Sequence, residues 1–225
     1  MLTILCAIAA AAALWVSSAV DQVMRGLVGS LFGVPFQGLQ IAADRAFLLT
    51  AIQGPTTSLG GGAFAAMVLA GALVSGLLAW LLYAFVRAVH SSGWLRAFAL
   101  AWVTVALLWL PAAMAASTLS RGAGPGHELY ARLGEPMAGR WTALALGLAG
   151  VFLAAGPISR CAVAVGRSWM RADGLEFRRR LVRVTVGWPA VTALALMAYA
   201  AGWAPSAWSL VFVVGALGAL QVQTR

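Results

Sequence analysis

The chain of 225 residues is 62% hydrophobic and 9% charged, with a mean hydropathy of +0.91. Because a soluble domain has about 25% charged residues, this composition excludes a soluble globular protein and predicts a single membrane domain over residues 1–225. The basic residues are all arginine, and the net charge is +9. Arginines that flank apolar spans follow the positive-inside rule and contact anionic lipid, so we expect no nucleic-acid partner.

Six segments come close to the roughly 20 apolar residues that a transmembrane helix requires. We therefore predict an all-α fold with about six spans, at residues 2–20, 62–86, 95–117, 141–160, 184–202 and 206–222. The first segment lacks the basic start of a signal peptide, so we expect it to be retained. The absence of lysine, with abundant Ala, Gly and Trp, suggests a GC-rich bacterial genome and hence the bacterial inner membrane.

Residues 21–61, between the first two spans, are only semi-apolar. We expect a helical continuation over 21–33, a short extended piece at VPFQGLQI and a partly inserted irregular segment around Asp44 and Arg45. Non-helical backbone at membrane depth must be buried by protein or line a cavity. This region is therefore the best place to look for a site or an interface.

Small residues at helical spacing, Gly71 with Ser75 and Gly215 with Gly218, predict faces on which helices pack closely. Cys6 and Cys161 have neither CxxC spacing nor a neighbouring histidine. We interpret them as small apolar residues within spans rather than as ligands of a zinc site.

The segment DGLEFRRRLVR, residues 173–183, predicts an interfacial helix. Its apolar residues Leu175, Phe177, Leu181 and Val182 are expected to face the acyl boundary, while its arginines meet anionic lipid headgroups: Arg178, Arg179, Arg180 and Arg183. Docking of a partner subunit is the alternative use of this helix. Most arginines fall on the side that holds the N-terminus, which favours that side as cytoplasmic.

Two charges stand one helical turn apart in the stretch VDQVMRGLVGSLFGVP, residues 20–35. Asp21 and Arg25 are at i and i+4, so they share a helix face, and Gln22 lies beside Asp21. Together with the Gly-Val-Pro that follows, this stretch resembles the site-2 protease family of intramembrane zinc metalloproteases. That family carries H-E-x-x-H here, with two histidines that hold zinc and a glutamate that acts as general base. The resemblance places Asp21 at the first histidine, Gln22 at the base and Arg25 at the second histidine.

Two weaker matches extend the resemblance over roughly residues 5–140. QGPTTSLGGGAFAAMVLAGALV, residues 53–74, resembles the family's Gly-Pro start of the next span. GAGPGHELYARLGEP, residues 122–136, resembles a segment that often carries an acidic zinc ligand, with His127 or Glu128 as the counterpart. The resemblance also implies that the motif lies near the cytoplasmic face, opposite to the side that the arginine distribution favours.

The departures from the family motif argue against its chemistry. Arg25 stays cationic and cannot ligate zinc, and Gln22 cannot act as a base. The histidines, His90 and His127, fall on opposite sides of the membrane in this topology. We therefore expect no metal, no cofactor and no catalytic residue. Asp44, His127 and Glu128 remain candidates for a polar pocket near the motif.

We hypothesise that an Asp21–Arg25 ion pair fills the place of the metal, with Gln22 hydrogen-bonded nearby. The alternative is that the first helix ends near Val20 and that both side chains reach out to water. Three functions follow. The first is a non-catalytic accessory subunit, or pseudoprotease, that binds a partner's transmembrane helix or braces a membrane complex. The second is a residual metalloprotease with a non-standard metal site, and the third is a small transporter or channel component.

Overall fold

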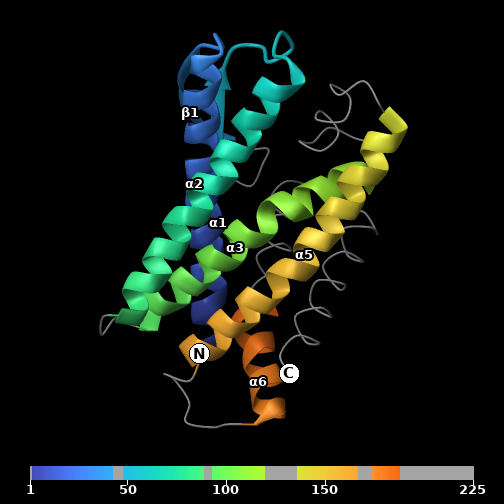
Figure 1. Ribbon diagram of the computed structural model, residues 1–225. Coiled ribbons are helices and arrows are strands. Elements are labelled where there is room, and N and C mark those ends of the chain that lie inside the picture. Colours follow the sequence, from blue (N-terminus) through green and yellow to red (C-terminus); the bar gives the residue numbers. More distant parts are fainter. Residues whose placement is uncertain (1, 43–47, 89–92, 120–135, 167–173, 188–225) are drawn as a thin grey trace.

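The computed structural model describes residues 2–42, 48–88, 93–119, 136–166 and 174–187, which are mostly helical (Figure 1). Its elements in chain order are α1 (Leu2–Leu31), β1 (Phe36–Ala42), β2 (Leu48–Gln53), α2 (Gly61–Ala88), α3 (Gly93–Leu119), α5 (Pro136–Gly166), α6 (Leu175–Val182) and a π-helical turn, η2 (Arg183–Gly187).

Within these described ranges, three helices are long and apolar enough to cross a membrane: Ile4–Leu31, Gly61–Ala88 and Trp141–Gly166. Helix α3 contributes a shorter apolar stretch, Gly93–Leu108. These helices fit an integral membrane protein and cover the first four predicted spans. The predicted spans at 184–202 and 206–222 fall almost wholly outside the described residues.

Helix α1 is longer than the first predicted span, because it continues as one helix to Leu31. The expected continuation over 21–33 is therefore confirmed to within two residues. The chain leaves the helix through Gly33, whose φ of +83° lies in the left-handed region that favours glycine.

The segment after α1 is a β-hairpin, so the strictly all-α fold is wrong here. The expected extended piece is β1, and it pairs antiparallel with β2, from Phe36 opposite Gln53 to Ala42 opposite Leu48. A register shift lies between Phe36 and Gly38, and the φ of +141° at Gly38 requires glycine. Pairing of two strands satisfies backbone groups that a single irregular segment would leave open. Asp44 and Arg45, which come between the two strands in the sequence, lie outside the described residues.

The helices form a bundle in which α3 packs against α1, α2 and α5. Its largest fully buried side chains are Val86, Leu100, Ile158 and Val182, one each from α2, α3, α5 and α6. Both cysteines are buried and unbridged, as expected for small apolar residues within spans. The hairpin lies along the second half of α1 (Figure 1).

Helix α6 lies within the predicted interfacial helix, but two of the apolar residues that were predicted to face lipid are buried in the protein. Leu181 and Val182 were expected at the acyl boundary, but they are 3% and 2% exposed. Leu181 packs on Gly166 at the end of α5, where any side chain would overlap it. This close approach brings α6 against the protein, so only Leu175 and, in part, Phe177 remain open on its apolar side.

Candidate functional site

Asp21 and Arg25 form an ion pair within α1. Arg25 Nε lies 2.8 Å from Asp21 Oδ2, and the two side chains are 19% and 4% exposed. The alternative, in which the helix ends near Val20 and both charges reach water, is wrong, because α1 continues past them and Asp21 is buried. The spacing-based prediction of a pair is confirmed.

Gln22 connects the ion pair to the hairpin. Its Nε2 donates to Asp21 Oδ2 at 3.4 Å, and its Oε1 accepts a hydrogen bond from the backbone N–H of Ala51, in β2, at 3.1 Å. A strand-edge N–H is thereby satisfied by a side chain of α1. Each of the three motif positions in α1 thus has a structural partner.

Gly71 of α2 closes the site from the opposite side. A Cβ at this position would overlap Asp21 Oδ1 and would lie 2.9 Å from the backbone oxygen of Asp21 and 3.0 Å from its Cα. Contacts this short require the neighbouring helix to move, so glycine permits the close approach of α1 and α2. Asp21 Oδ1 is buried there, without a hydrogen-bond partner among the described residues.

A second polar contact lies one helical turn away on both helices. The hydroxyl groups of Ser17 and Ser75 share a hydrogen bond of 2.9 Å, and Trp102 Nε1 donates to Ser75 Oγ at 3.3 Å. This contact joins α1, α2 and α3. We call the whole set the polar seam: Ser17, Asp21, Gln22, Arg25, Gly71, Ser75 and Trp102.

The face of α2 predicted from Gly71 and Ser75 is confirmed, since both are buried against α1. Sequence reasoning missed Ser17 and Trp102. Ser17 precedes Asp21 by four residues and therefore shares its face, a signal that could have been used. Trp102 offers no such signal, because its place is set by the packing of α3.

The other predicted pocket residues, Asp44, His127 and Glu128, lie outside the described residues, as does any link from Asp44 to Arg25. Among the described residues, no three side chains of His, Cys, Asp or Glu come together as a possible metal site. In the polar seam, the carboxylate is neutralised by a guanidinium, and the neighbouring amide is neither an acid nor a base. This arrangement can hold helices together, and its one carboxylate already has Arg25 as its partner.

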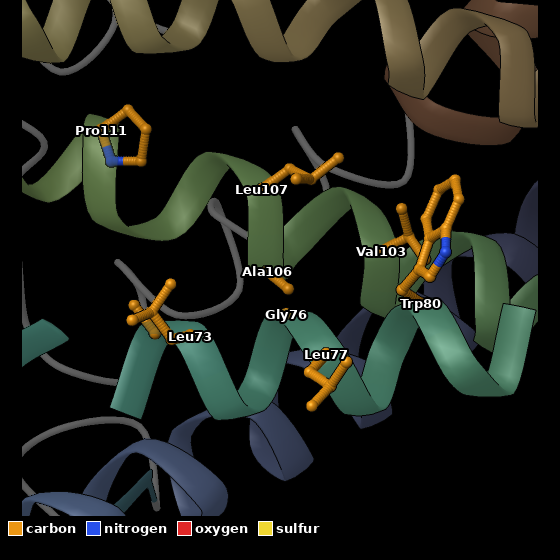
Figure 2. Close-up of a pocket in the computed structure, with 9 residues that line it drawn as sticks. Leu73, Gly76, Leu77, Trp80, Val103, Ala106, Leu107 and Pro111 are labelled. Carbon is orange, nitrogen blue, oxygen red and sulfur yellow. The ribbon is translucent and has the colours of Figure 1, made fainter. Parts of the chain in front are cut away.

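A separate apolar groove of about 400 Å³ lies between α2 and α3 (Figure 2). Its lining includes Leu73, Gly76 and Trp80 of α2, and Val103, Leu107 and Pro111 of α3. Ala106 points toward Gly76 across the groove. A Cβ at Gly76 would have no atom within 4 Å, so the groove has room beside this residue.

Comparisons of this chain with protein-family models, with curated proteins and with solved structures give no match.

Proposed function

We propose that this chain is a non-catalytic, site-2-protease-like protein of the bacterial inner membrane. It acts as a structural or accessory subunit that binds a partner's transmembrane helix or braces a membrane complex. The observation that carries the proposal is the Asp21–Arg25 ion pair, at the positions where the resembled family has its zinc-binding histidines. The pair lies within α1, at the point where Gly71 of α2 packs against Asp21, so a salt bridge stands where the resembled family would hold its metal.

The depth of the pair supports a structural role. Asp21 lies about 7 Å along the axis from the midpoint of α1, at 1.5 Å per residue. If α1 is centred in a hydrocarbon core about 30 Å thick, the carboxylate lies inside it. A charge at that depth is costly, so it is kept only where it is paired and has a role. Gln22 and Gly71 then fix this pair between α1, α2 and the hairpin.

The groove between α2 and α3 supplies a place for a partner's helix. Its lining is apolar and includes Gly76 and Ala106, small residues that allow a further helix to pack closely. Because no charged residue lines it, the groove suits an apolar helix rather than a polar substrate.

Metal analysis of the purified protein tests the non-catalytic assignment. We expect substoichiometric zinc in the wild type, with no difference in Asp21→Asn, which keeps the side-chain shape. Stoichiometric zinc that is lost in Asp21→Asn would instead support the residual metalloprotease. Cleavage of a transmembrane peptide, abolished by the same substitution, would point the same way.

Co-purification in mild detergent tests the subunit role, with two glycine variants of α2. Gly76→Leu places a side chain in the groove, at a position where a Cβ meets no atom within 4 Å, whereas Gly62→Leu adds the same side chain outside the groove, where a Cβ also meets no atom within 4 Å. We expect a membrane partner that remains bound in Gly62→Leu and is lost in Gly76→Leu. A wild-type protein that purifies alone, or a partner that both variants retain, would argue against binding in the groove.

A further inference from the structure

The end of α2, the start of α3, the end of α5 and α6 lie at the end of the helix bundle that holds the N-terminus, and each of these segments carries arginine (Figure 1). The arginines of these segments and of η2 are Arg87, Arg96, Arg160, Arg178, Arg179, Arg180 and Arg183. Glu176 is the one acid that accompanies them among the described residues. This end of the protein therefore carries a strong positive charge.

Helix α6 carries three of these arginines, and η2 carries a fourth, Arg183. Leu181 packs on Gly166, and Val182 belongs to the hydrophobic core of the bundle. Thr185 Oγ1 donates to the carbonyl oxygen of Leu181 at 2.9 Å, which ties η2 to the end of α6. Because α6 is anchored to the protein, its backbone does not have to be ordered when a ligand arrives.

Two arginine side chains of α6 and η2 are open to an anion, and a third lies partly open beside them. Arg180 and Arg183 are exposed, and Arg179 is half-buried. The Nε of Arg179 is buried and has no hydrogen-bond acceptor within the described part of the chain. The planar guanidinium matches the oxygens of a phosphate group with two parallel hydrogen bonds.

The same short helix also exposes apolar surface. Leu175 is 45% exposed, and Phe177 is half-buried. A ligand that contacts both the arginines and this apolar surface has a phosphate group next to an apolar chain. Neither a nucleic acid nor an acidic peptide combines the two in this way, but a phospholipid does. The position of α6, shortly after the candidate span that ends at Gly166, agrees with headgroup depth.

We propose that α6 and η2 form a binding site for the headgroup of an anionic phospholipid. The arginines contact the phosphate, and Leu175 with Phe177 contacts the start of the acyl chains. This site is distinct from the groove between α2 and α3 and does not depend on the proposed function.

Lipid titration followed by native mass spectrometry tests this site. The purified protein in detergent is titrated with phosphatidylglycerol or with phosphatidylcholine, and the two dissociation constants are compared. Each arginine near an anionic surface is worth about fivefold in affinity. We therefore expect R179Q/R180Q to bind phosphatidylglycerol roughly 25-fold more weakly, with no change for phosphatidylcholine.

The control is R140Q, which removes the same charge at the other end of α5 from Arg160. We expect its affinity for phosphatidylglycerol to stay within about twofold of the wild type. A second double variant, R180Q/R183Q, changes exposed side chains only. It tests the same site without changing the half-buried Arg179, whose loss could affect folding. Equal wild-type affinity for the two lipids would overturn the proposal. So would wild-type affinity for phosphatidylglycerol in R180Q/R183Q, or an equal loss in R140Q.

Discussion

Removal of Arg25 alone should destabilise the protein much more than removal of both charges. At the observed 2.8 Å separation, a pair attracts by about 6 kcal/mol at an effective dielectric constant of about 20. Desolvation offsets most of this, so the intact pair contributes little net stability. Arg25→Met, however, leaves the buried Asp21 carboxylate unpaired, which costs about 3–5 kcal/mol.

The double variant Asp21→Asn with Arg25→Met removes both charges and keeps the approximate shape of the two side chains. Asparagine keeps the contact with Gly71, and methionine keeps much of the length of arginine. We expect its free energy of unfolding to lie within about 1.5 kcal/mol of the wild type, since a buried ion pair can be replaced by uncharged groups at little cost.

Reversible unfolding in mixed micelles measures these free energies, with Arg160→Met as a control at an exposed position. We expect the control to change stability by less than about 0.5 kcal/mol. A cost below about 1 kcal/mol for Arg25→Met would show that Asp21 is solvated in the membrane. A double variant less stable than Arg25→Met would show that the pair contributes net stability, and the reasoning from desolvation would fail.

The rest of the polar seam gives three further predictions. Gly71→Ala should destabilise the protein by about 1–3 kcal/mol in the same unfolding assay, because the added methyl group overlaps α1. Gly76→Ala should be neutral or slightly stabilising, and equal effects of the two substitutions would contradict the packing argument. Ser75→Ala removes both of its hydrogen bonds in the seam and should cost about 1–2 kcal/mol by unfolding; no loss would mean that these bonds are replaced within the membrane. Gln22→Leu removes the side-chain acceptor of the Ala51 N–H, so amide hydrogen exchange in β2, measured by mass spectrometry, should speed up about fivefold. An unchanged exchange rate would show that another group protects this strand edge.

Local sequence was sufficient for the helices and for the ion pair. Runs of apolar residues located α1, α2, α3 and α5, because a span needs a minimum length and few charges. The i,i+4 spacing of Asp21 and Arg25 predicted their contact, because that geometry depends on one helix alone.

Local sequence was insufficient for the hairpin and for α6. The run LLTAIQ of β2 is short and apolar, so its pattern does not distinguish a strand from part of a buried helix. For α6, the amphipathic pattern predicted an apolar face but not its partner. The burial of Leu181 depends on Gly166, which is fifteen positions away in the chain and comes close only through tertiary packing.

Helix α2 contributes to both the polar seam and the groove, and adjacent residues separate the two. Ser75 hydrogen-bonds to α1 and α3, while Gly76, rotated by about 100° around the helix axis, lies in the groove. Each face can therefore be changed without the other. A seam variant should lower stability while an intact groove still binds its partner, and Gly76→Leu should lose the partner at full stability. Loss of the partner only in variants that also unfold would mean that the groove is an ordinary lipid-facing surface.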